Sequence, residues 1–142
     1  MNDPLAEAEQ RTREIFARQA VMATLGASIV HFEPGLVRVA MAHDDAFTQQ
    51  DGFLHAGIIA TVVDTALGCA AGSVMPPGSG VLSIEFKINM LRPARADRYL
   101  AEGRVLKAGR RITVCQGELR EDGLEGRILA SMQASMICVE GP

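Results

Sequence analysis

A single acidic residue, Asp64, interrupts a long apolar stretch of the sequence, and its carboxylate could act as a general base or as a nucleophile. From Ala56 to Ser73 no other side chain carries a charge at neutral pH. An isolated carboxylate is costly to bury, so Asp64 must be hydrogen-bonded or open to a cleft. Enzymes keep general bases under these conditions. A structural carboxylate that bonds a neighbouring strand, or faces solvent at a subunit boundary, fits the local pattern equally well.

Small residues lead into this stretch, in the segment Gly52-Phe53-Leu54-His55-Ala56-Gly57. Small residues at the start of a helix let a ligand approach the free backbone N–H groups, where the helix dipole favours negative charge. Such N–H groups could bind an oxyanion, for example the one that develops from a thioester carbonyl. His55 could carry a proton here, although a histidine that only orders the loop is the commoner case.

Composition excludes several classes of protein. The chain has 142 residues, of which 48% are hydrophobic, and a net charge of −3, which indicates one globular domain. Lysine and arginine are scattered, without the basic stripe that nucleic acid requires. No metal-ligand spacing links His31 and His43 to each other or to the three cysteines, which we expect to be buried thiols. We therefore expect no metal and no cofactor.

The location of the protein follows from two further segments. The N-terminus is acidic and polar, so we expect no signal peptide. The run from Ala56 to Val74 is apolar enough to raise the question of a membrane span, but Asp64, the glycines and the marginal length argue against one. The sequence therefore predicts a cytoplasmic protein without a membrane partner.

Two helices and six strands are expected around these residues. Asp3 and Pro4 begin an N-terminal helix that extends to Met22. The helix from Ala56 to Ser73 is apolar on every face, which predicts burial all round. Residues 81–91 alternate as a half-buried strand with Leu82, Ile84, Phe86, Ile88 and Met90 on the buried face. Further strands are expected at 27–32, 36–41, 99–107, 112–120 and 127–139.

The order of these elements predicts the fold class. A long antiparallel sheet needs an element to cover its apolar face, and only the helix at 56–73 is apolar enough to do so. We expect an α+β fold, in which five or six antiparallel strands wrap around one long buried helix. An additional helix occupies about residues 4–22, the core spans about 27–139, and residues 1–142 form one domain. An exposed edge of this sheet favours more than a monomer.

The segment from Gln49 to Gly57, together with Asp64, resembles the signature of the phenylacetic-acid-degradation-type thioesterases of the hotdog superfamily. That signature is Asn, two residues, Gly, two residues, His-Gly-Gly, and an acidic residue seven positions after the second Gly. Residues 83–94 are similar to the family's third strand, and Gly109-Arg110 to the turn between its fourth and fifth strands. This chain departs from the signature at Gln49, in place of Asn, and at Ala56, in place of the first Gly.

The resemblance implies a hotdog fold and the hydrolysis of a small, aryl or medium-chain acyl-CoA, with coenzyme A present only as part of the substrate. It implies that the Gly57 N–H polarises the thioester carbonyl and that Asp64 activates water or attacks the carbonyl directly. Gln49 would supply the side-chain amide that Asn supplies in the family, displaced by one methylene. Ser83 would orient the water or Asp64. Four arginines could bind the phosphates of coenzyme A, although solvated charges are commoner in turns: Arg92, Arg95, Arg110 and Arg111.

Helix geometry adds a constraint to these implied roles. Gly57 and Asp64 are seven residues apart, so they share a helix face but lie roughly 10 Å apart along its axis. The resemblance implies a homodimer or homotetramer in which two buried helices run antiparallel, so that each active site lies at a subunit interface. A hotdog dehydratase and a noncatalytic acyl-CoA-binding hotdog protein remain as alternatives.

Overall fold

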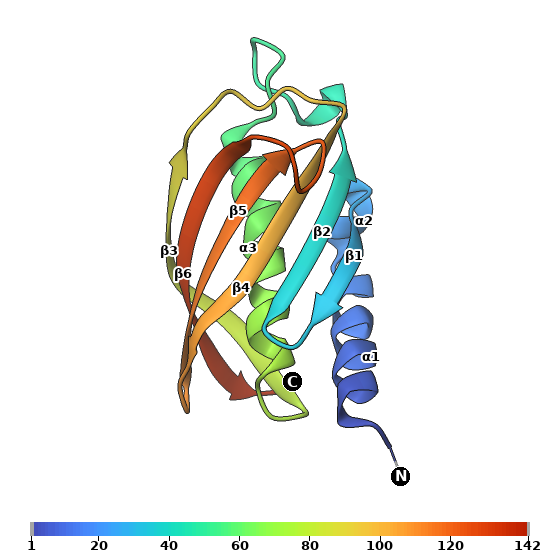
Figure 1. Cartoon of the computed structure of the whole chain (residues 1–142), viewed down its shortest axis with the longest axis vertical. Coiled ribbons are helices and arrows are strands. Elements are labelled where there is room, and N and C mark those ends of the chain that lie inside the picture. The colour runs from blue at the N-terminus through green and yellow to red at the C-terminus, as the bar shows by residue number, and fades with distance from the viewer. Residues whose placement is uncertain (1, 142) are drawn as a thin grey trace.

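The computed structural model describes residues 2–141 as one six-stranded antiparallel sheet curled around a long helix (Figure 1). The sheet order is β1-β2-β4-β5-β6-β3, which confirms the predicted α+β hotdog architecture. The helices are α1 (Pro4–Ala17), α2 (Ala20–Leu25), the short 3-10 helix η1 (Asp45–Phe47) and α3 (Ala56–Ser73). The strands are β1 (Ser28–Glu33), β2 (Leu36–Ala42), β3 (Ser79–Met90), β4 (Arg98–Ala108), β5 (Ile112–Glu121) and β6 (Ile128–Glu140).

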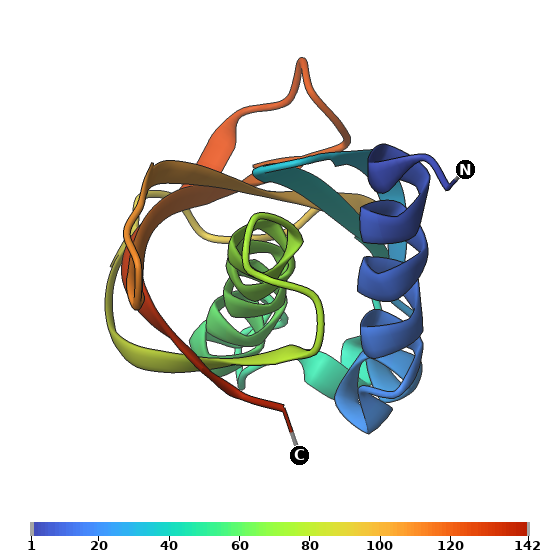
Figure 2. The same ribbon diagram turned by 90° about the horizontal axis from the view of Figure 1, so that it is seen from below.

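The core lies between α3 and the concave face of the sheet. Seen along α3, the sheet encloses most of the helix, and α1 lies on the side that the sheet leaves open (Figure 2). Val62, Val63 and Leu67 on α3 are fully buried and Ile58 is partly buried, as a helix enclosed by the sheet requires. They pack in one cluster with residues of the sheet that include Val39, Ala101, Leu119, Met132 and Ala134.

Two paired glycines let α3 lie very close to the sheet. Gly103 on β4 is directly opposite Gly117 on β5. A Cβ atom at Gly103 would lie 2.4 Å from the backbone of Ala66, and one at Gly117 would lie 2.9 Å from the Leu67 side chain. Any side chain at Gly103 would therefore push the helix backbone off the sheet.

The N-terminal helix differs from the prediction, because it is two helices with a break at Arg18 and Gln19. The predicted start is confirmed, since Asp3 Oδ1 accepts a hydrogen bond from the Leu5 N–H at 3.0 Å. At the break, Gln19 has an extended backbone with φ −78° and ψ 102°. Its Oε1 accepts a hydrogen bond from the Thr65 hydroxyl at 3.1 Å, so a contact with α3 stabilises the interruption.

Strand β3 also differs from the prediction, because a β-bulge changes which side chains face α3. The pairing with β6 shifts between Ser83, which is opposite Met136, and Glu85, which is opposite Ser135. Side chains directly opposite each other share a face of the sheet, so Ser83 faces inward before the bulge and Phe86 after it. Leu82 and Ile84 lie outside this inner face and are 58% and 52% exposed. The single buried face expected from the alternation is therefore wrong.

Helix α3 is buried on most sides, but the expectation of burial all round is also wrong. One stripe, spaced three and four residues apart as on a single helix face, is exposed or half-buried and comprises Gly57, Thr61, Asp64, Gly68 and Gly72. The sheet and α1 pack against most of the rest of the helix. Within residues 2–141, α3 is the one helix long and apolar enough by composition to cross a membrane, with a mean hydropathy of 1.4. Burial against the sheet accounts for this composition.

Candidate active site

Asp64 lies in the middle of the open stripe of α3, where its carboxylate has one defined partner. The Ser83 hydroxyl on β3 donates a hydrogen bond to Asp64 Oδ1 at 2.7 Å. The same hydroxyl lies 3.2 Å from the sulfur of Met136. The bulge in β3 makes this contact possible, because it places Ser83 on the same side of the sheet as α3. One carboxylate oxygen is thereby fixed.

A cavity of about 540 Å³ opens beside this carboxylate. It lies between α1, the open stripe of α3 and the strands β3 and β6, and its walls include Ile15, Asp64, Gly68, Val81, Ser83 and Met136. This volume falls in the range of small-molecule sites, roughly 300 to 1,000 Å³. The carboxylate is therefore accessible to a ligand of substantial size while it is held by Ser83.

A thiol also borders the cavity, but it is not suited to nucleophilic attack. Cys69 is 6% exposed, and desolvation by burial raises the pKa of its thiol to about 12. Burial likewise raises the pKa of Cys115 to about 11. With this raised pKa, the Cys69 thiol stays protonated at neutral pH. Because the thiolate is the reactive form, Cys69 is a poor nucleophile. Asp64 is therefore the better nucleophile or base of the two.

The start of α3 holds a second group of predicted residues. His55 is the N-cap, and its Nδ1 accepts a hydrogen bond from the Gly57 N–H at 2.9 Å. His55 thus orders the helix start, and it occupies the amide that was expected to polarise a carbonyl. Gly57 itself is exposed. An oxyanion could bind this N–H only after the imidazole has turned away.

Gln49 uses its side-chain oxygen within its own loop. Its Oε1 accepts hydrogen bonds from the N–H groups of Asp51 at 2.5 Å and Phe53 at 3.3 Å. Gln49 also borders a hollow of about 500 Å³ next to Ala56 and Arg92. Gln49, His55 and Gly57 are therefore grouped at the start of α3, two helical turns from Asp64 and Ser83.

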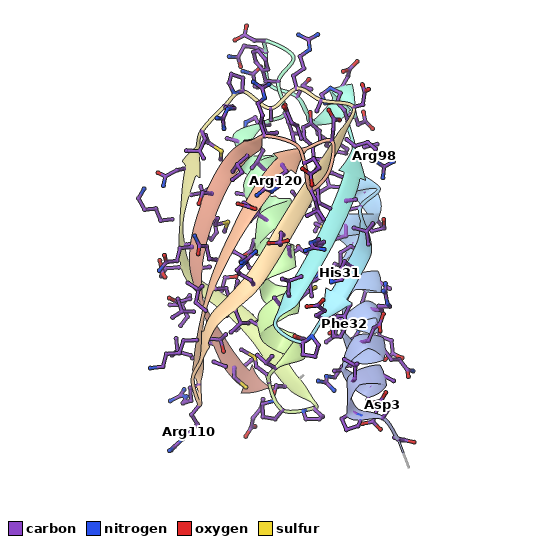
Figure 3. The ribbon with its side chains drawn as sticks, in the orientation of Figure 1. Asp3, His31, Phe32, Arg98, Arg110 and Arg120 are labelled. Atoms are coloured by element: carbon purple, nitrogen blue, oxygen red, sulfur yellow. The ribbon has the colours of Figure 1, made fainter. Side chains whose placement is uncertain are left out.

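The predicted arginines lie at opposite ends of the sheet. Arg92 Nη1 donates a hydrogen bond to the backbone oxygen of Ile128 at 2.6 Å, beside the start of α3. Arg110 and Arg111 lie in the turn between β4 and β5, and Figure 3 shows Arg110 at the far end of the molecule. One chain therefore does not bring these cations together. Within residues 2–141, no group of three His, Cys, Asp or Glu residues lies close enough to hold a metal ion.

Apart from Asp64 and Ser83, the residues that line the cavity were not identified as site residues from the sequence; Ile15, Gly68 and Gly72 are three of them. The two glycines follow Asp64 at intervals of four residues, so the helical period would have placed them on the same face. Ile15 is 37% exposed although it is apolar. Its position at the cavity depends on how α1 docks, which the sequence pattern does not define.

Comparison with known proteins connects this geometry to a family. The thioesterase superfamily matches residues 51–126, more than half of the 142-residue chain. A thioesterase family protein from Silicibacter pomeroyi is 46% identical, with a TM-score of 0.90 over 94% of this chain and 99% of that chain. The Escherichia coli PaaI protein of the phenylacetic acid degradation operon shares the fold, with a TM-score of 0.88, 21% identity and 98% coverage of both chains.

Among curated proteins, the medium/long-chain acyl-CoA thioesterase YigI of Escherichia coli is 24% identical over 113 residues, which cover 69% of this chain and 73% of that protein. The family match includes the start of α3, Asp64 and Ser83. The curled sheet, the enclosed helix and the sequence match agree with the resemblance noted from the signature at residues 49–64. The chain therefore belongs to the thioesterase superfamily and is a thioester hydrolase with a hotdog fold.

Proposed function

We propose that this protein is a cytoplasmic acyl-CoA thioesterase that uses Asp64 to hydrolyse small, aryl or medium-chain acyl-CoA esters. The observation that carries the proposal is the Asp64 carboxylate, which is hydrogen-bonded to Ser83 at 2.7 Å and borders a cavity of about 540 Å³. The acyl-CoA thioesterase activity named for YigI supports the choice of substrate class and favours hydrolysis over dehydration.

In the proposed reaction, Ser83 holds one oxygen of Asp64 and leaves the other directed at the reactants. The free oxygen takes a proton from water, whose oxygen attacks the thioester carbonyl carbon. The carbonyl oxygen becomes an oxyanion that accepts a hydrogen bond from a backbone N–H. The oxyanion then collapses, the C–S bond breaks, and the departing sulfur of coenzyme A takes the proton that Asp64 had accepted from water, which restores the carboxylate. Direct attack by Asp64, to form an anhydride that water cleaves, uses the same contacts.

The N–H in this reaction is that of Gly57 in a second subunit. In one chain, Gly57 and Asp64 lie roughly 10 Å apart along α3, because seven residues rise by 1.5 Å each. Strand β3 lies at the edge of the sheet, and four of its apolar side chains are 42% to 58% exposed: Leu82, Ile84, Phe86 and Met90. An exposed, apolar edge strand is suited to pairing with another strand.

A two-fold axis beside β3 would place two copies of α3 antiparallel, with each Gly57 near the partner's Asp64. The same axis brings the Arg92 end of one chain toward the Arg110 and Arg111 end of the other. We assign the coenzyme A phosphates to this junction, because arginine binds phosphate through paired N–H groups. A homodimer satisfies these requirements, and so does a homotetramer built from such dimers.

The test is the Asp64→Asn variant, assayed with a thiol reagent against acetyl-, hexanoyl-, decanoyl- and phenylacetyl-CoA. Asparagine keeps an acceptor for Ser83 but removes the base, so kcat should fall by about 10² to 10⁴. The melting temperature should not fall, because the Ser83 contact persists and a half-buried charge is removed. The matched control is Asp122→Asn, in the turn between β5 and β6, where φ of 56° suits asparagine.

A structural role for Asp64 predicts the opposite pair of results, with hydrolysis nearly intact and a lower melting temperature. A noncatalytic acyl-CoA-binding protein is the second candidate, because His55 occupies the Gly57 N–H and Gln49 Oε1 is engaged in its loop. Binding of acyl-CoA by calorimetry without release of free thiol would favour this candidate and contradict the proposal.

A further inference from the structure

A glycine in the middle of α3, Gly68, has no role in packing the chain. Glycine is the poorest helix former apart from proline, so its place inside a buried helix needs a reason. On strand β4, Gly103 is required by packing, because a Cβ atom there would lie 2.4 Å from the backbone of Ala66. On α3, packing restricts Gly72 less strongly, since a Cβ atom there would lie 3.1 Å from the Val81 side chain. A Cβ at Gly68 would meet no atom within 4 Å.

The space beside Gly68 is the cavity that holds Asp64. Both residues border it, and Gly68 lies one turn after Asp64 on the open stripe, roughly 6 Å farther along the axis. The cavity continues to Gly72 and does not include Gly57 or Thr61. From Asp64 it therefore extends toward the end of α3, away from Gly57 and Arg92 of the same chain.

We propose that Gly68 determines the acyl-chain specificity of the enzyme, because its missing side chain leaves the passage through which the acyl chain leaves the thioester carbonyl. This inference rests on the proposed thioesterase function. Three residues that line the cavity suit a hydrocarbon: Ile15 on α1, Val81 on β3 and the protonated thiol of Cys69. The charged residues Arg11, Arg18 and Glu140 also border it. This passage also explains why Ile15 is left 37% exposed in a helix that packs on α3.

The position of Gly68 sets the chain length at which it matters. An extended carbon chain advances roughly 1.2 Å per bond, by analogy with the 3.3 to 3.6 Å of an extended residue with three backbone bonds. The roughly 6 Å between Asp64 and Gly68 thus corresponds to about five bonds. Acyl chains longer than about six carbons must pass Gly68, whereas a butyryl group ends before it.

The experiment measures kcat/KM for decanoyl-CoA and butyryl-CoA in the full-length enzyme and in the variants Gly68→Ala and Gly68→Leu. The decanoyl-to-butyryl ratio should fall at least tenfold in Gly68→Leu and less in Gly68→Ala. Adding Ile15→Ala to Gly68→Leu should recover part of the ratio, because it removes bulk from the facing wall. The matched control is Ala6→Leu, which adds the same side chain at an exposed position of α1 outside the cavity and should not change the ratio.

Stability and assembly are measured on the same samples. Gly68→Ala should raise the melting temperature, because alanine favours the helix and meets no neighbour, and this variant keeps the test valid if Gly68→Leu fails to fold. Light scattering should give the wild-type subunit number. Dissociation of both variants would show that Gly68 is a subunit contact, and would overturn the inference.

Three kinetic outcomes separate this inference from the proposed function. An unchanged ratio in a folded, assembled Gly68→Leu enzyme overturns the role of Gly68, while loss of activity in Asp64→Asn leaves the thioesterase proposal standing. A wild-type enzyme that hydrolyses butyryl-CoA but not decanoyl-CoA also overturns the inference alone. Hydrolysis that persists in Asp64→Asn overturns the catalytic proposal, whatever the ratio.

Discussion

Two inactive variants should restore each other's activity if each active site is shared between two subunits. Asp64→Asn removes the base, and Gly57→Pro removes the N–H that would bind the oxyanion. Gly57 lies at the second position of α3, in the first turn, where proline is tolerated because the amide has no partner in the helix backbone. The substitution also removes the hydrogen bond from the Gly57 N–H to His55 Nδ1. Each homodimer carries two damaged sites and should be inactive.

The distances along α3 determine the expected size of the recovery. A hydrogen bond to the oxyanion and a contact from carboxylate to attacking water span about 3 Å each, which is too short to bridge roughly 10 Å along one helix. If the site is shared, a heterodimer of the two variants pairs one intact Asp64 with one intact Gly57. Random mixing makes half of the dimers heterodimers, so about a quarter of wild-type activity should return.

The assay uses two affinity tags, so that heterodimers are purified from co-expressed subunits and their thiol release is measured directly. About half of the wild-type kcat per dimer is expected. The matched control is a heterodimer of wild-type with a subunit that carries both substitutions, which should be inactive if the sites are shared. The reverse result, an inactive first heterodimer and a half-active second one, would refute the shared site and place Gly57 and Asp64 of one chain in one site.

Two further predictions concern the stability of the fold. Gly103→Ala should destabilise the protein by about 1 to 3 kcal/mol, the usual cost of overpacking, and should lower the midpoint of chemical unfolding, because a Cβ there lies 2.4 Å from the Ala66 backbone. Glu102 is 5% exposed and binds Arg38 at 2.7 Å and also Arg104. Burial alone would raise the pKa of Glu102, but hydrogen bonds and charges from these arginines hold it below its ordinary value. Its stabilisation is therefore present above the pKa of the unfolded state and is lost as the pH falls below about 4. Accordingly, Glu102→Gln should cost about 1 to 3 kcal/mol at pH 7 and much less at pH 3, as unfolding curves at the two pH values would show.

Local sequence signals were sufficient for α3 and for the positions of the strands along the chain, but not for the order of the strands in the sheet, where β3 pairs with β6. The apolar run after His55 ends before Pro76 and Pro77, so both ends of the helix carry a signal. The turns at 92–97 and 108–111 likewise separate strands that the structure places within one or two residues of their expected positions. These features depend on residues that are neighbours in the sequence.

The two errors in secondary structure have tertiary causes. Residues 82–90 alternate without interruption, and only the pairing of β3 with β6 reveals the bulge at Ile84. The break after α1 is stabilised by the contact between Gln19 and Thr65, which are 46 positions apart. Neither partner is visible in a local pattern, and propensity alone favours one longer helix.

In the candidate site, too, the residue with a local sequence signal was predictable, and the residues that depend on tertiary contacts were not. Asp64 stands out because one carboxylate in an apolar helix is expensive, whereas Ser83 could be named only through the family resemblance. Its contact with Asp64 depends on the bulge, because the bulge places Ser83 on the inner face of the sheet, whereas the alternating pattern placed it on the outer, polar face. Gly68 carried a signal, a glycine one turn after the carboxylate, but its meaning depends on the empty space around it.

The open stripe of α3 and the exposed strand β3 have one explanation in common. The sheet and α1 together leave open the stripe of α3 that carries Gly57 and Asp64, and the edge strand beside this stripe exposes apolar side chains on both faces. Covering that edge with a second copy would bury the apolar side chains and supply the missing half of each site. Assembly and catalysis would then share one surface, so the chain has no need to bring its own Gly57 and Asp64 together.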